Sequence, residues 1–430
     1  MLSFDAVFRP FESFFLQKFG TGEDAGVHFR FANTPQSLAE SDFVGAGSSS
    51  PALAKEHFSI LVDGLPTFHR DERRVSMGPR RISELYHDEI LLPAVPARGL
   101  ADADDFSQLK SEALHRWEST RLASLLNHGT DYLPSEAIPA EWWDAHRPEV
   151  WTHQTFAVKN STAPTAPEAR DAGGLFGFLR PRLYGTRGKP TQASVSEVEI
   201  DFDFCLVSIE RPWLLTAFLD YRRWILPGHA SGELSLNDGT GLPALPVALV
   251  AVKALRIEAD WTPPDVSALE QSVQFGPFNF DSRIVDGAIW HHGIQIVGWL
   301  LRHLPQLPPS PAEIHEPSDP TTLSDATFGT AMTESPMPVL VEFFAASVGA
   351  SVAMAPIVRQ LAAQYADAVR FVRIDVAASP NTVNRCGVAR VPTFILFHGG
   401  RPVDALVGPV PSLRLQSLLE SARALRKKGG

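Results

Sequence analysis

The only thiols in the chain are Cys205 and Cys386, and they lie far apart in the 430-residue sequence. They form neither a Cys-x-x-Cys pair nor a disulfide framework, and so few cysteines are typical of a reducing compartment. Cys205 lies in a predicted core strand, where a free thiol behaves as a small apolar side chain. Cys386 is therefore the one candidate for thiol chemistry.

A row of carboxylates at alternate positions is a candidate cation site. Its members are Glu197, Glu199, Asp201 and Asp203. Carboxylate oxygens bind Ca²⁺ or Mg²⁺, but successive side chains on one face of a strand lie about 7 Å apart. Because one ion would need further ligands from elsewhere, we expect a strand with a solvated acidic face. Its other face is apolar, with Val198, Ile200, Phe202, Phe204 and Leu206.

Two further clusters invite a binding role. His291 and His292 are adjacent, so on a strand they point to opposite faces, and no third ligand stands at metal-binding spacing. The turn at residues 70–81 holds five arginines, a composition that suits an anion, but Asp71 and Glu72 partly neutralise it. We expect no metal at the histidines and a solvated or ion-paired loop at the arginines.

An enzyme site in the N-terminal region is a further hypothesis, built on Arg73, Arg74 or the histidine pair. The sequence contains neither a Gly-x-Gly-x-x-Gly motif nor a Walker-type phosphate loop. It also shows no nucleophile, base and acid at recognisable spacing, so this hypothesis has no motif to support it.

The first predicted element along the chain is a helix rich in phenylalanine. Phenylalanines at positions 4, 8, 11, 15 and 19 recur at helical spacing, with Pro10 interrupting them. We expect this helix to pack on its own domain, and docking to a partner or a membrane surface is the alternative. Another helix is predicted at residues 107–127, and a short strand-like run at residues 57–66. Strands are expected at residues 245–255 and 272–280, and residues 294–301 are apolar enough to be buried.

Two segments rich in proline and small residues divide the chain. Residues 160–174 have the composition of an exposed loop or linker, and a strand-rich pattern follows them. Residues 305–320 are rich in proline and indicate a semi-rigid, extended spacer. We therefore predict a mixed α+β region at residues 1–304, either undivided or split near 160–174, followed by the linker and a C-terminal domain at residues 321–428.

Composition limits the partners and the compartment. With 44% hydrophobic and 20% charged residues, the chain is that of an ordinary globular protein. Its net charge of -11 argues against a nucleic-acid partner, because phosphate binding requires a basic face. No secretory leader and no run of about 18 apolar residues is present. We expect a cytoplasmic protein without a transmembrane segment.

The stretch at residues 339–358 has the layout of a redox site without its chemistry. An apolar strand, a turn of small residues and a helix carrying Pro356 follow one another, and Val-Pro-Thr-Phe comes later at residues 391–394. This order, continued to residue 428, resembles thioredoxin. The family places Trp-Cys-Gly-Pro-Cys where this chain has Ser347, Val348, Gly349, Ala350 and Ser351. Both cysteine positions are therefore lost, to Val348 and Ser351.

The resemblance implies an α/β domain with the family's strand and helix order but without its reaction. Exchange requires a thiolate at a helix N-terminus and a second, resolving cysteine. Glu342 matches a buried acid that tunes the family's cysteine, and Pro392 matches a cis proline beside a peptide groove. If Val391-Pro392 is cis here, a groove formed with residues 347–351 is expected to accept an extended peptide.

We therefore favour a non-enzymatic α+β multidomain protein that uses no cofactor. Its thioredoxin-like domain would serve interaction or assembly, by docking a protein partner, by self-assembly, or by packing on the large domain. The alternative is an oxidoreductase that acts through Cys386 alone, although this cysteine is not predicted at a helix N-terminus.

Overall fold

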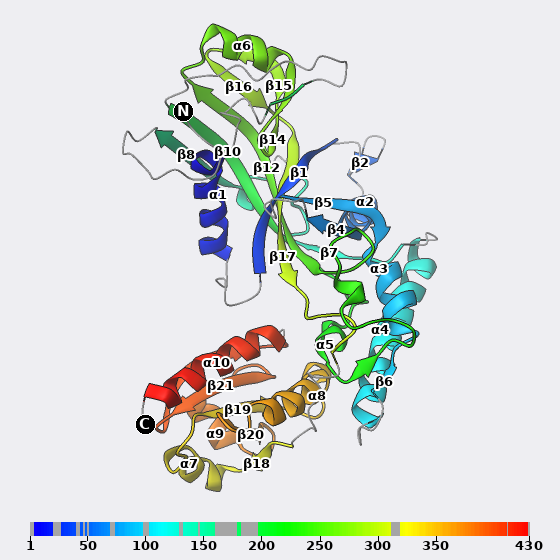
Figure 1. Cartoon of the computed structure of the whole chain (residues 1–430), viewed down its shortest axis with the longest axis vertical. Coiled ribbons are helices and arrows are strands. Elements are labelled where there is room, and N and C mark those ends of the chain that lie inside the picture. Colours follow the sequence, from blue (N-terminus) through cyan, green and yellow to red (C-terminus); the bar gives the residue numbers. More distant parts are fainter. Residues whose placement is uncertain are drawn as a thin grey trace.

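A computed structural model of the chain describes residues 4–19, 27–39, 44–45, 48–49, 51–68, 74–97, 103–128, 132–144, 147–159, 179–181, 197–310, 319–410 and 412–428. Figure 1 shows a large domain built around long, crossing strands and a smaller C-terminal domain below it. Each has its own sheet. The protein is thus of mixed α+β class.

The large domain is organised by a ten-stranded sheet of order β15-β16-β12-β17-β1-β5-β4, in which β10 also pairs with β12, β7 and β8. Its strands are β1 (Val27–Leu38), β4 (Gly64–Phe68), β5 (Arg74–Arg81), β7 (Glu136–Ile138), β8 (Thr152–Lys159), β10 (Glu197–Glu210), β12 (Ala244–Ala259), β15 (Asp281–Val285), β16 (Ala288–His291) and β17 (Ile294–His303). Strands from both sides of residues 160–174 share this sheet, so it is not divided there. Residues 160–174 themselves lie outside the described part of the chain.

Short strands complete the large domain. They are β2 (Val44–Gly45), β3 (Ser48–Ser49), β6 (Val95–Pro96), β9 (Leu179–Pro181), β11 (Trp224–Ile225), β13 (Ser272–Phe275) and β14 (Phe278–Asn279). The strand predicted at residues 272–280 is thus two strands, β13 and β14, with Gly276 between them in a left-handed conformation (φ 57°).

Helix α1 (Phe4–Phe19) covers one face of the large sheet, as expected from the phenylalanine spacing. Phe11 and Phe15 are fully buried, and the Phe11 ring stacks on Phe202 of β10 at 4.9 Å between centroids. Pro10 lies within the helix without ending it. The described part of α1 is therefore packed on its own domain.

Helix α2 (Pro51–Val62) covers the opposite face and corrects the prediction of a strand-like run at residues 57–66. Ala54, Phe58 and Val62 are spaced by four residues and are all buried against the sheet. That spacing places them on one side of a helix, and only β4 from Gly64 onward is extended. A short apolar run is ambiguous between helix and strand.

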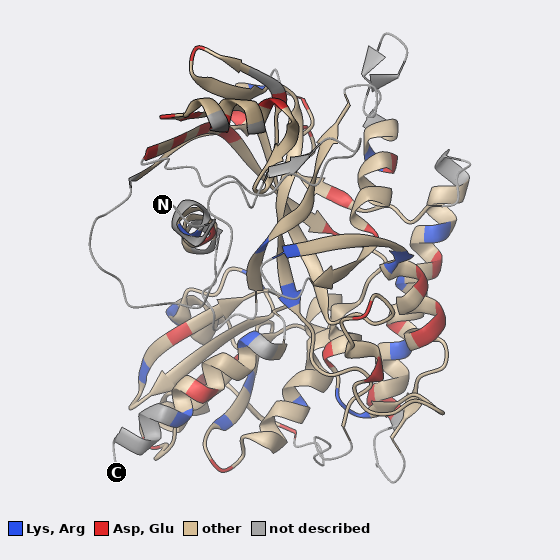
Figure 2. Ribbon diagram, turned by 45° about the horizontal axis from the view of Figure 1, so that its top comes forward, with Lys and Arg blue, Asp and Glu red and all other residues tan. Residues whose placement is uncertain are grey.

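Helices α4 (Ala103–His128) and α5 (Thr216–Asp220) lie toward the C-terminal domain, whereas α6 (Pro263–Glu270) lies at the opposite end of the large domain (Figure 1). The helical elements of the large domain not yet named are α3 (Ile82–Glu84), the π-helix η3 (Leu85–Leu91) and the 3-10 turns η4 (Pro148–Val150) and η6 (Glu233–Ser235). Helix α4 contains the predicted helix at residues 107–127. Acidic and basic residues are interspersed over these elements rather than gathered into one basic face (Figure 2).

The C-terminal domain has a five-stranded sheet of order β18-β20-β19-β21-β22. Its elements are β18 (Thr321–Leu323), α7 (Asp325–Thr333), β19 (Val339–Phe344), α8 (Gly349–Gln364), β20 (Arg370–Asp375), α9 (Pro380–Cys386), β21 (Thr393–His398), β22 (Arg401–Val407) and α10 (Ser412–Lys428). Strand β19 is parallel to β20 and antiparallel to β21. Helices α8 and α10 contribute to the core on one face, and α7 and α9 flank the core on the other.

The beginning of the proline-rich segment is packed rather than extended. Leu307 is fully buried, and its N–H donates to Ser235 Oγ at 2.6 Å. The carbonyls of Leu307 and Pro308 accept hydrogen bonds from Leu234 N and Gly232 N. Residues 305–310 therefore belong to the large domain, and residues 311–318 lie outside the described part of the chain.

Candidate functional site

The loop that matches a redox motif lies at the start of α8. Val348 is the N-cap residue of this helix, and its carbonyl accepts a hydrogen bond from Ser351 N at 2.9 Å. The Ser351 side chain is 1% exposed, and its hydroxyl accepts a hydrogen bond from Ala345 N at 3.3 Å. Val348 has no ionisable group at the helix N-terminus, and the Ser351 hydroxyl is engaged with the backbone.

The proline opposite this loop has the predicted geometry. The Val391-Pro392 peptide bond is cis, and the Pro392 carbonyl accepts a hydrogen bond from Gly408 N at 2.7 Å. Pro392 is buried, whereas Val391 is half-buried. The cis bond expected before Pro392 is therefore present, and Gly408, which donates to the Pro392 carbonyl, is in a left-handed conformation (φ 89°).

Glu342 lies in the middle of β19 and is 1% exposed. Burial raises the pKa of its carboxyl group, and the nearby Arg373 guanidinium opposes that rise. Arg373 Nε donates to Glu342 Oε2 at 2.7 Å and its guanidinium lies 3.9 Å from the centre of the Phe344 ring. Within the described chain Glu342 Oε1 has no hydrogen-bond partner. The predicted buried acid is thus present, with an arginine as its neighbour.

The large domain packs against the face of the C-terminal domain that carries this loop (Figure 1). Helix α8 contacts α4 and α5, and α10 also contacts α5. One continuous apolar cluster includes Leu109 of α4, Phe218 of α5 and Met354 and Ile357 of α8. The two domains therefore share a core at this boundary.

The contact includes Ala350 of the loop that was predicted to form one side of the groove. A cavity of about 170 Å³ is lined by Ala350 of the loop and by Pro409 and Val410, which follow β22. Its opposite wall is formed by residues 214–217 of the large domain. The large domain therefore lies beside Ala350 and residues 409–410.

Polar contacts fix the orientation of this boundary. Arg359 of α8 forms an ion pair with Asp105 of α4, and the Arg222 N–H donates to Gln360 Oε1 at 2.9 Å. Asp220 Oδ2 accepts hydrogen bonds from Ser412 N, at the start of α10, and from Arg302 Nη1, each at 3.2 Å. Asp220 is 3% exposed, so its carboxylate is satisfied inside the boundary.

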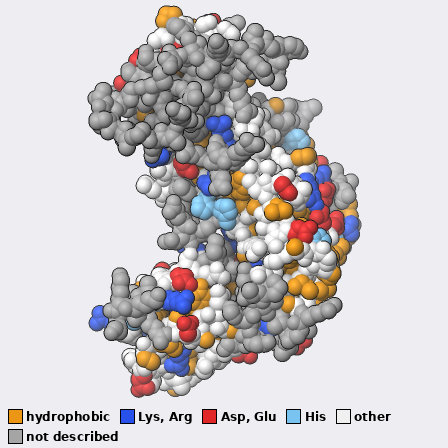
Figure 3. Space-filling view, viewed as in Figure 1, with side chains coloured by type: hydrophobic (Ala, Val, Ile, Leu, Met, Phe, Trp, Pro, Cys, Tyr) orange, Lys and Arg blue, Asp and Glu red, His pale blue; other side chains and the backbone are white. Residues whose placement is uncertain are grey.

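The outer part of the loop faces an open groove. Ser347 and Gly349 form one wall of a hollow of about 510 Å³ beside helix α4. The other wall carries polar residues spaced so that they share one side of that helix: Gln108, Ser111, Glu112 and His115. The notch between the two domains at the left edge of Figure 3 is a different feature, because it lies on the side away from α4. Hydrogen-bonding side chains are therefore available to a polar chain lying along this groove.

Cys386 lies on the other side of the C-terminal sheet. It is the last residue of α9 and packs against the core that includes Phe328 and Ile395. Burial raises the pKa of its thiol, and the neighbouring Arg385 only partly opposes this. It lines a different pocket from residues 347–350. Cys205 is 3% exposed, and burial raises its pKa to about 12.

The acidic row on β10 is paired with basic side chains. Glu199 lies 3.9 Å from Arg256, and Asp203 lies 4.0 Å from Lys253. His153 of β8 is within 3.2 Å of Asp201 and 3.1 Å of Asp203. The row is therefore the polar face of a strand whose charges are shared with its neighbours.

The histidine and arginine clusters are likewise engaged. His291 lies 3.7 Å from Asp281, and burial lowers its pKa. Arg80 pairs with Glu89, and Arg81 lies 3.8 Å from Glu84. Arg70 and Arg73 lie outside the described residues. Within the described chain no group of three His, Cys, Asp or Glu side chains is placed to hold a metal ion.

The residues that join the domains carry no sequence signal of their own. Arg359, Gln360 and Asp220 are polar residues in or beside helical segments, and such residues are usually solvated. Their role in joining the domains is evident only from the structure, in which both domains bury surface around them. The part of the chain that the structure describes also has no helix long and apolar enough to cross a membrane.

Comparison with known proteins gives matches to the C-terminal domain. The thioredoxin family model matches residues 319–421. Over 98 residues, 23% of this chain, the sequence is 44% identical to thioredoxin M4, chloroplastic, of Arabidopsis thaliana, of which the match spans 51%. It is 39% identical to a thioredoxin of Synechocystis, covering 92% of that protein. A thioredoxin structure from Malassezia sympodialis is 23% identical, with a TM-score of 0.24, and covers 26% of this chain and 95% of that one.

Proposed function

Because the chain belongs to the thioredoxin family through residues 319–421, we propose that this domain is a docking module that has lost the family's thiol chemistry. The observation that carries the proposal is the pair Val348 and Ser351 at the cysteine positions, on a loop that adjoins the large domain. The domain keeps the cis Val391-Pro392 bond and the buried Glu342. The thioredoxin-like domain thus serves binding rather than thiol-disulfide exchange.

This module binds, in the first place, the large domain of the same chain. Helix α8 and residues 409–410 pack against α4 and residues 214–217, and buried polar contacts at Asp220 and Gln360 fix the arrangement. Obligate contacts of this kind combine an apolar core with satisfied polar groups. The module therefore holds the helical end of the large domain in one orientation.

A protein partner or a second copy would meet the part of the groove that stays open. Ser347 and Gly349 face the polar side of α4 across a hollow of about 510 Å³. Val348 and Val391 are half-buried, and an extended peptide could pair with the backbone at the Val391-Pro392 edge. The specific role of the assembly then lies in the large domain.

The alternative function, exchange through Cys386 alone, has less support. A reactive thiol needs a lowered pKa and access, whereas burial raises the pKa of Cys386 at the C-terminal end of α9.

Insulin reduction with dithiothreitol distinguishes the two functions. The wild-type protein is expected to show the rate of dithiothreitol alone. The double variant Val348→Cys, Ser351→Cys shows in the same chain whether the frame supports exchange when the thiols are present. Turnover by the wild type that disappears in Cys386→Ser would replace the docking proposal with the single-cysteine one.

A further inference from the structure

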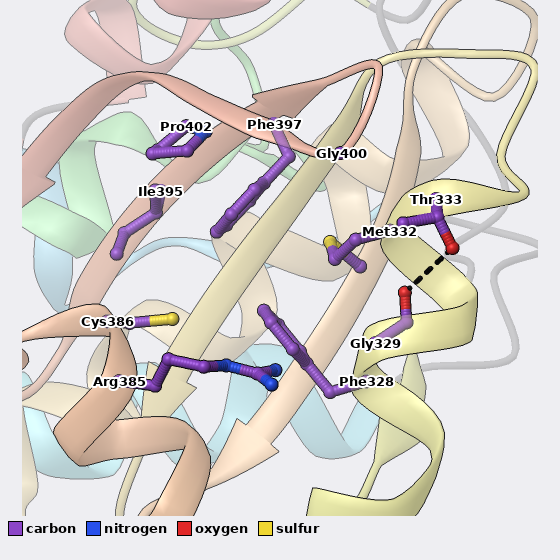
Figure 4. A pocket seen from close by; sticks show the side chains of 10 residues that line it. All are labelled: Phe328, Gly329, Met332, Thr333, Arg385, Cys386, Ile395, Phe397, Gly400 and Pro402. Atoms are coloured by element: carbon purple, nitrogen blue, oxygen red, sulfur yellow. Dashed lines mark hydrogen bonds between the residues drawn. The ribbon is translucent and has the colours of Figure 1, made fainter.

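A second hollow lies in the C-terminal domain, on the opposite side of its sheet from α8. It is bounded by α7, the end of α9 and the hairpin of β21 and β22, and its volume is about 390 Å³ (Figure 4). Pockets that bind small molecules typically enclose about 300–1,000 Å³. The hollow is therefore large enough for a small organic ligand.

Its walls are mostly apolar. They are formed by Phe328, Met332, Ile395, Phe397 and Pro402. The Phe328 and Phe397 rings meet edge to face, with centroids 5.7 Å apart. The only charged residue among those that line the hollow is Arg385. An aromatic or hydrocarbon body would be desolvated against these walls.

Gly329 of α7 is one of the residues that line the hollow. Gly329 lies in the interior of this helix, where glycine is less favourable than alanine by about 0.5–1 kcal/mol. A Cβ atom built at Gly329 would have no neighbour within 4 Å. A large side chain at this position would therefore project into unfilled space beside the pocket instead of clashing with the core.

Arg385 gives one end of the hollow a positive charge. Its guanidinium group points toward the Phe328 ring, 5.2 Å from the ring centre (Figure 4). The structure shows no ion pair for Arg385 with any described carboxylate, and no acidic residue lines the hollow. The adjacent Cys386 thiol also points into the hollow (Figure 4), and because burial raises its pKa it adds no negative charge.

We infer that this pocket binds a small amphipathic carboxylate, with its apolar body between Phe328, Met332 and Phe397 and its carboxylate on Arg385. Guanidinium and carboxylate groups pair through charge-assisted hydrogen bonds. Neither the docking surface nor the residues at the cysteine positions take part, so this site is independent of the proposed docking role.

Cys386 supplies a direct reporter of occupancy in the full chain. The probes are 4-phenylbutyrate and its uncharged counterpart 4-phenylbutanol, and the readout is the rate at which Cys386 reacts with N-ethylmaleimide, followed by peptide mass spectrometry. Cys205 is 3% exposed and gives little background. Saturating 4-phenylbutyrate is expected to slow the labelling of Cys386 about tenfold. The apparent affinity for 4-phenylbutanol should be about tenfold weaker, because the alcohol lacks one charge-assisted contact.

Three variants make the test specific. Arg385→Gln should weaken 4-phenylbutyrate about tenfold and leave 4-phenylbutanol unchanged. Gly329→Leu should abolish the protection by both compounds, with folding checked by circular dichroism. Arg390→Gln, an exposed arginine outside the pocket, should bind both compounds like the wild type.

Equal affinity for the acid and the alcohol, or no selective effect of Arg385→Gln, would overturn the inference. So would the absence of any protection at millimolar 4-phenylbutyrate. Because Arg385 is exposed, its variant tests the site even if Gly329→Leu fails to fold.

Discussion

The Arg359 guanidinium, on α8 of the thioredoxin-like domain, is paired with the carboxylate of Asp105 on α4 of the large domain. Arg359 Nε lies 3.0 Å from Asp105 Oδ2, and the two side chains are only 20% and 12% exposed. The pair flanks the apolar contact between α4 and α8. Its partial burial makes it a constraint on how the two domains meet, because neither charge can be left unpaired without a cost.

Arg359→Met is expected to loosen this boundary. It keeps the apolar stem and leaves the Asp105 carboxylate partly buried without its partner, at a cost of about 1–3 kcal/mol. The measurement is the free energy of urea unfolding, with hydrogen exchange of α8 to locate the effect. As a control, Arg423→Met removes an exposed pair with Asp367 (47% and 70% exposed) and should change stability by less than about 1 kcal/mol. Equal effects of the two variants would show that the Arg359 pair contributes nothing specific.

The thioredoxin-like domain was largely predictable because its signals are local. An apolar run, a turn of small residues and a helix carrying Pro356 are found as β19, residues 345–348 and α8. The cis bond before Pro392 also follows from the family resemblance. Each of these features depends on neighbouring residues, and so the sequence alone contains the information.

The residues that dock the two domains were not predictable, because they are far apart in the sequence and meet only in the fold. Asp220 accepts hydrogen bonds from Arg302 and from Ser412 N, and in sequence it is an acid beside a short helix. Likewise β1 pairs with β17 from the far end of the large domain. Residues 57–62 were predicted to be strand-like because an apolar run does not distinguish a helix from a strand. Pairing and burial across the fold decide such cases.

Gly329→Ala is expected to stabilise the C-terminal domain. Alanine at this helical position has open space for its Cβ and lowers the entropy of the unfolded chain, a gain of about 0.5–1 kcal/mol. Gly387→Ala is the matched control: it also has open space, but its φ is +66°, which disfavours a side chain. Chemical denaturation should therefore show opposite signs for the two variants. Destabilisation by Gly329→Ala would mean that α7 needs glycine for another reason.

Glu342→Gln is expected to flatten the dependence of stability on pH. Burial raises the pKa of Glu342 in the folded protein above its ordinary value of 4.5. The unfolded chain therefore loses this proton first, and the free energy of unfolding falls as pH rises from about 4.5 through the folded pKa. Glutamine has no proton to lose, so the variant should lack this decline. Urea titrations at intervals between pH 4 and 8 measure the two slopes.

Asp325→Asn serves as the control of opposite sign for this pH dependence. Asp325 accepts a hydrogen bond from Thr382 N at 2.7 Å, and its hydrogen bonds lower its pKa. Its contribution to stability is present above its ordinary pKa and is lost as pH falls through the lowered one. The difference between wild type and Asp325→Asn should therefore shrink in acid. Parallel slopes for wild type and Glu342→Gln would contradict the assignment of a raised pKa to Glu342.

Phe11→Ala tests whether α1 is part of the large domain or a separable docking helix. The Phe11 ring is fully buried and lies 4.4 Å from Phe156 and 4.9 Å from Phe202, centroid to centroid. Truncating a buried phenylalanine typically costs about 3–5 kcal/mol, because the cavity only partly closes. Ser13→Ala, on the exposed side of the same helix, should change stability by about 0.5 kcal/mol or less. Urea unfolding followed by tryptophan fluorescence gives both values. If Phe11→Ala destabilised the protein as little as Ser13→Ala, α1 would be detached in solution and free to bind a partner. A large loss of stability in Phe11→Ala alone would make α1 a structural element of the large domain.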